Sequence, residues 1–171
     1  HVTLRLVHDD RAVKQYAEAV AEDSKERERQ RKETEQVKAL YEKSKGIGDR
    51  SVAHRYLSEQ RHISTEPGKD VKTTRVWDRS TSKHYPAIIA FARNGAGEVT
   101  GGQKIYLDPE TGAKAEVEVL KKSFGKIGGS FVHLGLEQNQ VKGGITFIAE
   151  GLETGLSIKE SGIAEERDKI L

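Results

Sequence analysis

The sequence predicts an α+β fold: helices first, then a mainly antiparallel sheet, then the start of a strand–helix unit. Residues 9–43 carry a long helical pattern, and residues 85–134 hold short apolar runs separated by turn residues. A final apolar run, residues 145–149, has the pattern of a buried strand and is followed at once by a helical pattern. Helices grouped before strands indicate the α+β class, and the closing strand–helix pair indicates the beginning of an α/β unit.

The first helix is expected over residues 9–43, with Asp9 or Asp10 as its amino-terminal cap. Residues 22–36 are almost wholly polar, and opposite charges recur three and four positions apart, a spacing that stabilises a helix exposed to water. A helix with no apolar stripe cannot dock firmly on a core. We therefore expect a solvated linker helix, and the near balance of its charges disfavours the alternative of a nucleic-acid-binding arm.

A helical hairpin and a loop are expected over residues 44–84. The glycines at the two ends of residues 46–48 interrupt the first helix, and a second helix follows over residues 52–57, capped by Ser51 or Asp49. The polar stretch after it is expected to be a loop. A plain helical hairpin is the favoured interpretation, and the alternative is a helix–hairpin–helix that holds a DNA backbone through exposed amide groups.

The β region is divided by turn residues. Strands are expected at residues 87–92, 98–107, 117–120, 131–134 and 145–149, with turns at 94–97, 108–112 and 142–144 and a glycine-rich loop at 125–129. A helix is expected from residue 152, ending near Gly162.

Composition limits the classes of function. The chain of 171 residues is long enough for one domain with an appendage. It has no cysteine, which excludes disulfides and thiolate zinc sites, and no two histidines have the spacing of a helical zinc site. With a net charge of only +2, nucleic acid would have to be bound by local patches. No apolar run is long enough to span a membrane and no secretory signal is visible, so we expect a cytoplasmic protein.

The best candidate for chemistry is the acid at the end of the last apolar strand. Glu150 follows residues 145–149 directly, and the carboxyl ends of strands are where ligands bind in open α/β sheets. Glu153 lies one helical turn further on the same side. Because Mg²⁺ prefers oxygen ligands, Glu150 and Glu153 are candidate metal ligands. The alternative is that Glu150 only stabilises the start of the helix.

Lysines precede this acid in the sequence. Lys104, Lys121, Lys122 and Lys126 occur with aromatic residues between them. Such a stretch could hold a nucleic-acid backbone while the aromatic rings stack on bases. The alternative is that the rings lie in the core and the lysines are simply solvated.

One block of the sequence resembles a known family. Phe147–Thr154 is similar to the first motif of the Toprim domain, which bacterial primases, topoisomerases and related nucleases contain. Earlier blocks resemble primase-like Toprim proteins of phages and mobile elements, and the carboxyl-terminal part of some conjugative relaxases. They are Ala39–Tyr41 with Gly48–Leu57, Tyr85–Ala90, Tyr106–Asp108 with Lys114–Ala115, Phe124–Lys126 and Val132–Gly135. The resemblance covers roughly residues 37–160.

The resemblance implies roles and a domain plan. Glu150 would match the family's catalytic acid/base or metal-associated glutamate, and an Asp-x-Asp pair on a later strand would complete its Mg²⁺ site. No Asp-x-Asp follows Glu150 here, so Mg²⁺ and phosphoryl transfer are expected only in a complete parent protein. We expect residues 1–8 to be the tail of a preceding domain, 9–43 a linker helix, 44–84 the hairpin and loop, and 85–171 a primase-like β region truncated within a Toprim domain.

The chain is thus expected to be the primase-like Toprim region of a conjugative relaxase, and to bind single-stranded DNA or RNA. Two alternatives remain open. One is a non-catalytic module that recruits other conjugative-transfer proteins. The other is a simple DNA-binding domain that uses the glycines of residues 46–48 and the lysine-rich strands.

Overall fold

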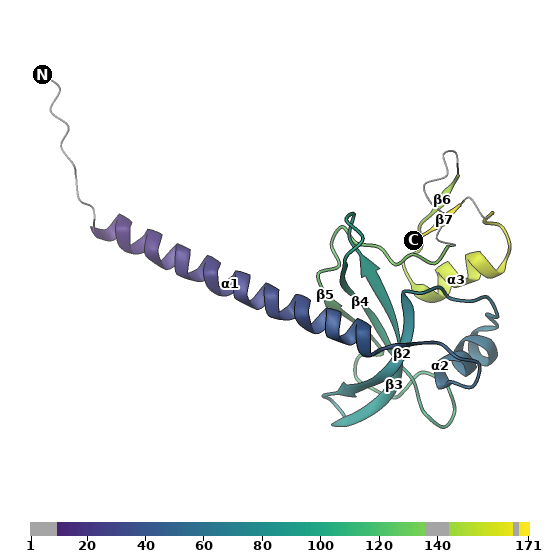
Figure 1. Ribbon diagram of the computed structural model, residues 1–171. Coiled ribbons are helices and arrows are strands. Elements are labelled where there is room, and N and C mark those ends of the chain that lie inside the picture. Colours follow the sequence, from purple (N-terminus) through teal and green to yellow (C-terminus); the bar gives the residue numbers. More distant parts are fainter. Residues whose placement is uncertain (1–9, 136–143, 166–167) are drawn as a thin grey trace, which may run out of the picture.

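The structure is a computed structural model that describes residues 10–135, 144–165 and 168–171 (Figure 1). Its helical elements are α1 (Asp10–Lys43), α2 (Val52–Arg55), the π-helical turn η1 (Tyr56–Gln60) and α3 (Leu152–Glu160). Its strands are β1 (Lys45–Gly46), β2 (Val71–Asp78), β3 (Lys83–Arg93), β4 (Val99–Tyr106), β5 (Lys121–Gly125), β6 (Thr146–Phe147) and β7 (Lys169–Ile170). The predicted α+β class is confirmed.

Five strands form one antiparallel sheet in the order β1-β2-β3-β4-β5, so each strand pairs with its neighbour in the sequence. The predicted turn at residues 94–97 joins β3 to β4. The Asn94 side chain accepts hydrogen bonds from the N–H groups of Ala96 and Glu98, and Gly97 has a φ of 80°, which glycine adopts readily. The strands β6 and β7 form a separate parallel pair.

Side chains alternate along each strand and so point to opposite faces of the large sheet. Each face of the sheet packs against its own core cluster. On β3, Ile88 and Ala90 belong to a core cluster that α2, η1 and α3 also enter, and we call this side the α3 face. Ile89 and Phe91 belong to a second cluster with Val37 of α1, and we call that side the α1 face. The sheet is therefore the middle of three layers, between the end of α1 and the shorter helices (Figure 1).

Only the carboxyl-terminal part of α1 enters the core. Val37 is the one buried residue of this 34-residue helix, whereas Tyr16 is 73% exposed. The helix projects away from the sheet (Figure 1). Its charges pair along its own surface, as Arg31 does with Glu28 at 2.9 Å. The prediction of a solvated charged helix is confirmed. Within the described ranges, no helix is both long and apolar enough to cross a bilayer.

One expected loop and two expected strands differ from the structure. The expected loop before residue 84 contains β2, most of which is an edge strand because β1 pairs with only two of its residues. Edge strands tolerate polar side chains, which hid the pattern. The strand expected at residues 117–120 forms instead as β5, whose Lys-Lys-Ser run has no apolar alternation. Residues 131–134 form no strand: Phe131 forms a bridge with Arg93, and the N–H of Leu134 donates to the carbonyl of Ile170 at 2.9 Å.

The last part of the chain follows the prediction more closely. The strand expected at residues 145–149 shortens to β6, which pairs with β7. The helix α3 begins at residue 152 as predicted, and Gly162, with a φ of 69°, follows its end. Three expectations lie outside the described residues: the domain tail at residues 1–8, the Asp9 cap and most of the turn at 142–144.

The two amino-terminal helices do not lie as expected. Ser51, one of the two predicted caps, does cap α2, since its Oγ accepts a hydrogen bond from the N–H of His54 at 3.0 Å. Instead of stacking side by side, however, α1 and α2 lie on opposite faces of the sheet, and β1 between them pairs with β2. A helix–hairpin–helix requires adjacent helices, so this arrangement does not support a DNA-binding hairpin.

A buried ion pair ties α1 to the sheet. The Asp70 carboxylate is 1% exposed and accepts hydrogen bonds from Arg93, from Nε at 2.8 Å and from Nη2 at 2.7 Å. Tyr41, near the end of α1, donates to the same carboxylate at 3.3 Å and accepts from Arg93 at 3.0 Å. Because a buried charge is stable only when it is paired, this triad fixes the place where α1 leaves the sheet.

Candidate functional site

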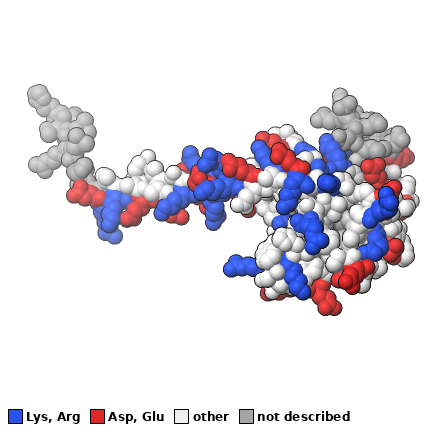
Figure 2. Space-filling model, turned by 60° about the horizontal axis from the view of Figure 1, so that its bottom comes forward, with Lys and Arg blue, Asp and Glu red and all other residues white. Residues whose placement is uncertain are grey.

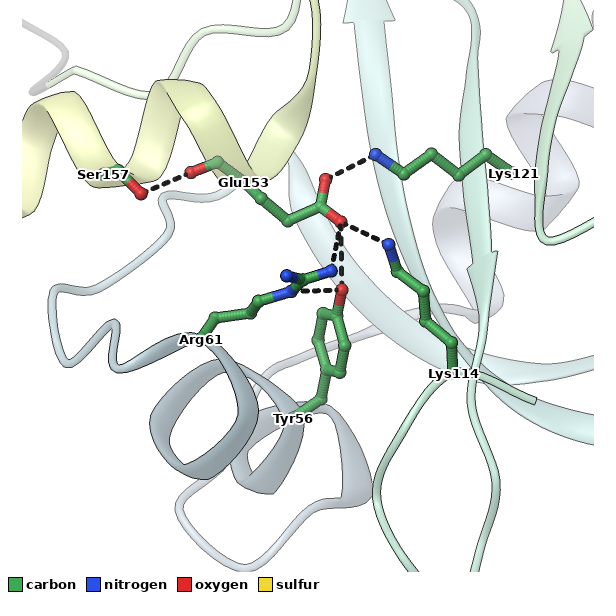
Figure 3. Close-up of polar contacts among 6 residues, drawn as sticks. All are labelled: Tyr56, Arg61, Lys114, Lys121, Glu153 and Ser157. Carbon is green, nitrogen blue, oxygen red and sulfur yellow. Dashed lines mark hydrogen bonds and ion pairs between the residues drawn. The ribbon is translucent and has the colours of Figure 1, made fainter.

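Four side chains converge on the carboxylate of Glu153 (Figure 3). Lys121 donates to Oε2 at 2.8 Å, and the Lys114 ammonium lies 3.1 Å from Oε1. Tyr56 donates to Oε1 at 2.9 Å, and Arg61 Nη2 lies 3.6 Å from the same oxygen. Arg61 also donates from Nε to the Tyr56 hydroxyl at 2.9 Å. We call these five residues the Glu153 cluster.

The cluster joins distant parts of the chain. Glu153 lies in the first turn of α3, where the helix dipole favours a carboxylate. Lys121 opens β5 with its side chain on the α3 face, and Lys114 is placed by a backbone bridge to the residue that follows β4. Tyr56 and Arg61 come from the start of η1 and the position just after it. The side chains from η1 and the β4–β5 region therefore meet at the start of α3.

The surroundings of Glu153 keep it ionised. Burial by itself raises the pKa of Glu153, but hydrogen bonds from Lys121, its backbone N–H, Lys114 and Tyr56 lower it to about 2. Burial, together with the neighbouring carboxylate, raises the pKa of Tyr56 to about 12, so its hydroxyl keeps the proton that it donates.

The Glu153 cluster has more positive than negative charge. Arg61, Lys114 and Lys121 are cations around a single carboxylate, which leaves a charge of +2 among the described residues. The carboxylate is 14% exposed, while the side chains of Arg61 and Lys121 are 38% and 37% exposed. Solvent therefore reaches the outer side of the cations more easily than it reaches Glu153.

The two predicted metal ligands lie in different surroundings. Glu153 does not fit a Mg²⁺ ion in this arrangement, because the surrounding cations would repel the metal. Glu150 is exposed in the turn before α3 and lines a cleft of about 230 Å³ with Gln103, Ser123 and Leu152. In the part of the chain that the structure describes, no three His, Asp or Glu side chains are grouped to hold a metal ion. The metal role of Glu150 and Glu153 stays a prediction, for which Glu150 presents the more accessible carboxylate.

The four lysines predicted to bind nucleic acid lie on different surfaces. Lys104 and Lys122 are direct partners across β4 and β5, and their side chains are on the α1 face. Lys121 points to the α3 face, where it contacts Glu153. Lys126 is exposed just after the end of β5. The structure thus brings Lys104 and Lys122 together and separates Lys121 from them.

A groove of about 370 Å³ lies where α1 crosses the sheet, and Lys43, Lys104 and Phe124 line it together with Glu33. The Lys104 ammonium lies 4.7 Å from the centre of the Phe124 ring. Burial lowers the pKa of Lys104, and repulsion from Lys122 and Lys43 lowers it further. We call Lys43, Lys104 and Lys122 the α1-face lysines, and none of them forms an ion pair with a carboxylate within the described ranges.

Figure 2 shows the charge pattern on one face of the molecule. In Figure 2, positive and negative side chains alternate along α1, whereas several Lys and Arg side chains lie across the middle of the globular part. Local patches, and not the small net charge, are therefore where an anionic partner would bind.

Sequence reasoning did not find the roles of Tyr56 and Arg61. Both residues come more than 90 positions before Glu153, so no local pattern relates them to it. The alternation of side chains along a strand does predict that Lys121 and Lys122 point to opposite faces of the sheet. That prediction requires both residues to be placed in one strand, whereas the expected strand ended just before them.

Comparison with family models gives a match for the amino-terminal and middle parts of the chain. A family model described as "Domain of unknown function (DUF7146)" matches residues 31–134, which is more than half of the chain. No curated protein and no solved structure matches the chain. The matched residues contain the α1-face lysines and the cationic members of the Glu153 cluster, but neither Glu150 nor Glu153.

Proposed function

The chain belongs to the DUF7146 family, whose function is unknown, and we propose that it is a nucleic-acid-binding module. In this proposal the α1-face lysines hold the phosphate backbone of single-stranded DNA or RNA. All three lie within the matched residues 31–134, so the module is the part of the chain that precedes the Toprim-like block Phe147–Thr154.

The observation that carries the proposal is the unbalanced charge around Lys104. Its ammonium is partly buried over Phe124, beside the like charges of Lys43 and Lys122. Burying a charge is costly unless an opposite charge balances it. A phosphate group in the groove would provide that balance, and contacts to phosphates supply much of the affinity of proteins for nucleic acids.

We further propose that the module works in a primase-like Toprim protein of the conjugative-relaxase type, in the cytoplasm. The support is the similarity of Phe147–Thr154 to the first Toprim motif, together with its position at the turn from β6 to α3. In a complete parent protein, Glu150 would be the carboxylate available to Mg²⁺ for phosphoryl transfer. Lys121 contacts Glu153 and is not part of the proposed backbone site.

The test measures binding of a 5′-hydroxyl single-stranded oligonucleotide by fluorescence anisotropy at several salt concentrations. Lys104→Ala and Lys122→Ala are each expected to weaken binding about tenfold, the effect of one lost hydrogen bond to a charged group. The slope of log affinity against log salt should fall by about 0.7 for each lost phosphate contact. Lys121→Ala is the matched control, since it removes the neighbouring charge on the other face of the same strand.

Two outcomes would contradict the backbone site: no binding at low salt, or equal weakening by Lys121→Ala and Lys122→Ala.

The second candidate function is recruitment of other transfer proteins. It is favoured by the exposed apolar residues Val13, Tyr16 and Val20 on the projecting part of α1. Absence of nucleic-acid binding would make recruitment the better account.

A further inference from the structure

We propose that the Glu153 cluster binds a phosphate monoester, on the face of the sheet opposite to the α1-face lysines. The charge of the cluster selects this ligand. The three cations exceed the one carboxylate by +2 among the described residues, and a phosphate monoester carries about −2 at neutral pH. A phosphodiester or a carboxylate carries a single negative charge and would leave the cluster positive.

The three cations are close enough together to share one anion. Lys114 and Arg61 approach Oε1 at 3.1 Å and 3.6 Å, and Lys121 approaches Oε2 of the same carboxylate at 2.8 Å. Figure 3 shows these groups converging from β5, from the loop before it and from the end of η1. A tetrahedral phosphate presents three terminal oxygens, so it can accept hydrogen bonds from several of these groups on their solvent side. The planar guanidinium of Arg61 is suited to paired hydrogen bonds with phosphate.

Glu153 has two opposing effects on such a ligand. It holds the cations together, because it is ionised and accepts their hydrogen bonds. It also repels an anion through its own charge. Neutralising this carboxylate should therefore strengthen phosphate binding, a response that a purely structural ion-pair network would not give.

The test uses the full chain and inorganic phosphate at pH 7.5, with the dissociation constant measured by NMR chemical-shift titration. Lys121→Ala and Arg61→Ala are expected to weaken binding about tenfold, and Glu153→Gln is expected to tighten it severalfold. The dissociation constant is taken from the shifts of residues in the Glu153 cluster. The matched control is Lys122→Ala, which alters the next residue of β5 on the other face, so these shifts should titrate as they do in the wild type. Circular dichroism tests whether each variant is folded. If Glu153→Gln is not folded, the comparison of Lys121→Ala with Lys122→Ala decides whether the Glu153 cluster binds phosphate.

Two oligonucleotides of one sequence, with a 5′-phosphate or a 5′-hydroxyl group, separate the two sources of this ligand. If the protein prefers the phosphorylated oligonucleotide, and Lys121→Ala loses this preference while Lys104→Ala keeps it, the ligand of the Glu153 cluster is the 5′-phosphate at the end of a nucleic-acid strand. Binding of inorganic phosphate without that preference assigns it to a small phosphorylated molecule. The proposal is overturned if phosphate does not bind, or if Lys121→Ala and Lys122→Ala bind it equally. Since the two proposed sites use different lysines, failure of one is distinguishable from failure of the other.

Discussion

Replacing Glu153 with glutamine is expected to lower the free energy of unfolding by about 3 kcal/mol at pH 7. The pKa of Glu153 is about 2 in the folded protein, and that of an unperturbed glutamate is about 4.3. A tenfold difference in acidity corresponds to about 1.4 kcal/mol, so the ionised carboxylate stabilises the fold by about 3 kcal/mol. For a chain of this length the expected fall in Tm is roughly 6–12 °C.

The effect should depend on pH in a defined direction. Because the pKa of Glu153 is lower in the folded than in the unfolded state, the stabilisation is complete above about pH 5. It is lost as the pH falls from about 4.3 through about 2, and below that pH the carboxyl group is protonated in both states. The difference between wild type and Glu153→Gln should therefore shrink over this window.

Urea unfolding followed by circular dichroism at a series of pH values measures this difference. Glu150→Gln is the matched control, because Glu150 is exposed near the same helix terminus, and it should change stability by less than about 0.5 kcal/mol. A difference that stays constant from pH 7 to pH 3 would refute the reasoning, as would equal stability of the two variants at pH 7.

Three further substitutions can be tested by the same urea titrations at pH 7. Asp70→Asn should cost about 3 kcal/mol, since it leaves the partly buried guanidinium of Arg93 without a counter-charge, and a loss below about 1 kcal/mol would contradict the importance of this pair. Gly102→Ala should cost about 2 kcal/mol because the added Cβ would collide with the backbone of β3, whereas Gly95→Ala, with nothing within 4 Å of its Cβ, should be neutral. Val37→Ala should cost about 2 kcal/mol and Val20→Ala less than about 0.5 kcal/mol; equal effects would mean that the core extends along α1.

The sequence predicted those parts of the fold in which local pattern and burial agree. The strand β3 is an apolar run, and in the Asn-Gly turn after it the Asn94 side chain accepts a hydrogen bond from the N–H of Ala96. Both features depend on residues close together in the sequence, so the sequence predicted them. The strand β2 was not, because its position near the edge of the sheet leaves its polar residues in contact with water. The strand β5 begins with two lysines, and its place is decided by backbone pairing with β4 rather than by apolar side chains.

The candidate site was predictable only in part, for a related reason. Glu150 was singled out because it lies at a strand-to-helix turn, and Glu153 because it lies one helical turn further on, and both are local features. The partners of Glu153, Tyr56 and Arg61, are brought to it by tertiary packing of η1 against α3, which no sequence spacing encodes. Lys121 and Lys122 are adjacent in sequence but belong to opposite faces, so a basic run in the sequence became two separate surfaces.

The polar part of α1 determines both the distance and the rotation angle about the helix axis between its amino-terminal apolar residues and the α1-face lysines. A helix rises about 1.5 Å and turns about 100° per residue, so residues 10–36 form a stretch about 40 Å long. Deleting one residue from this stretch would rotate the direction in which Val13 and Tyr16 face by about 100° while leaving Val37 in the core. Deleting seven would shorten the helix by about 10 Å and change that direction by only about 20°. The helix therefore fixes the rotational phase between its amino-terminal apolar residues and the α1-face lysines, and a partner that contacts both must match that phase.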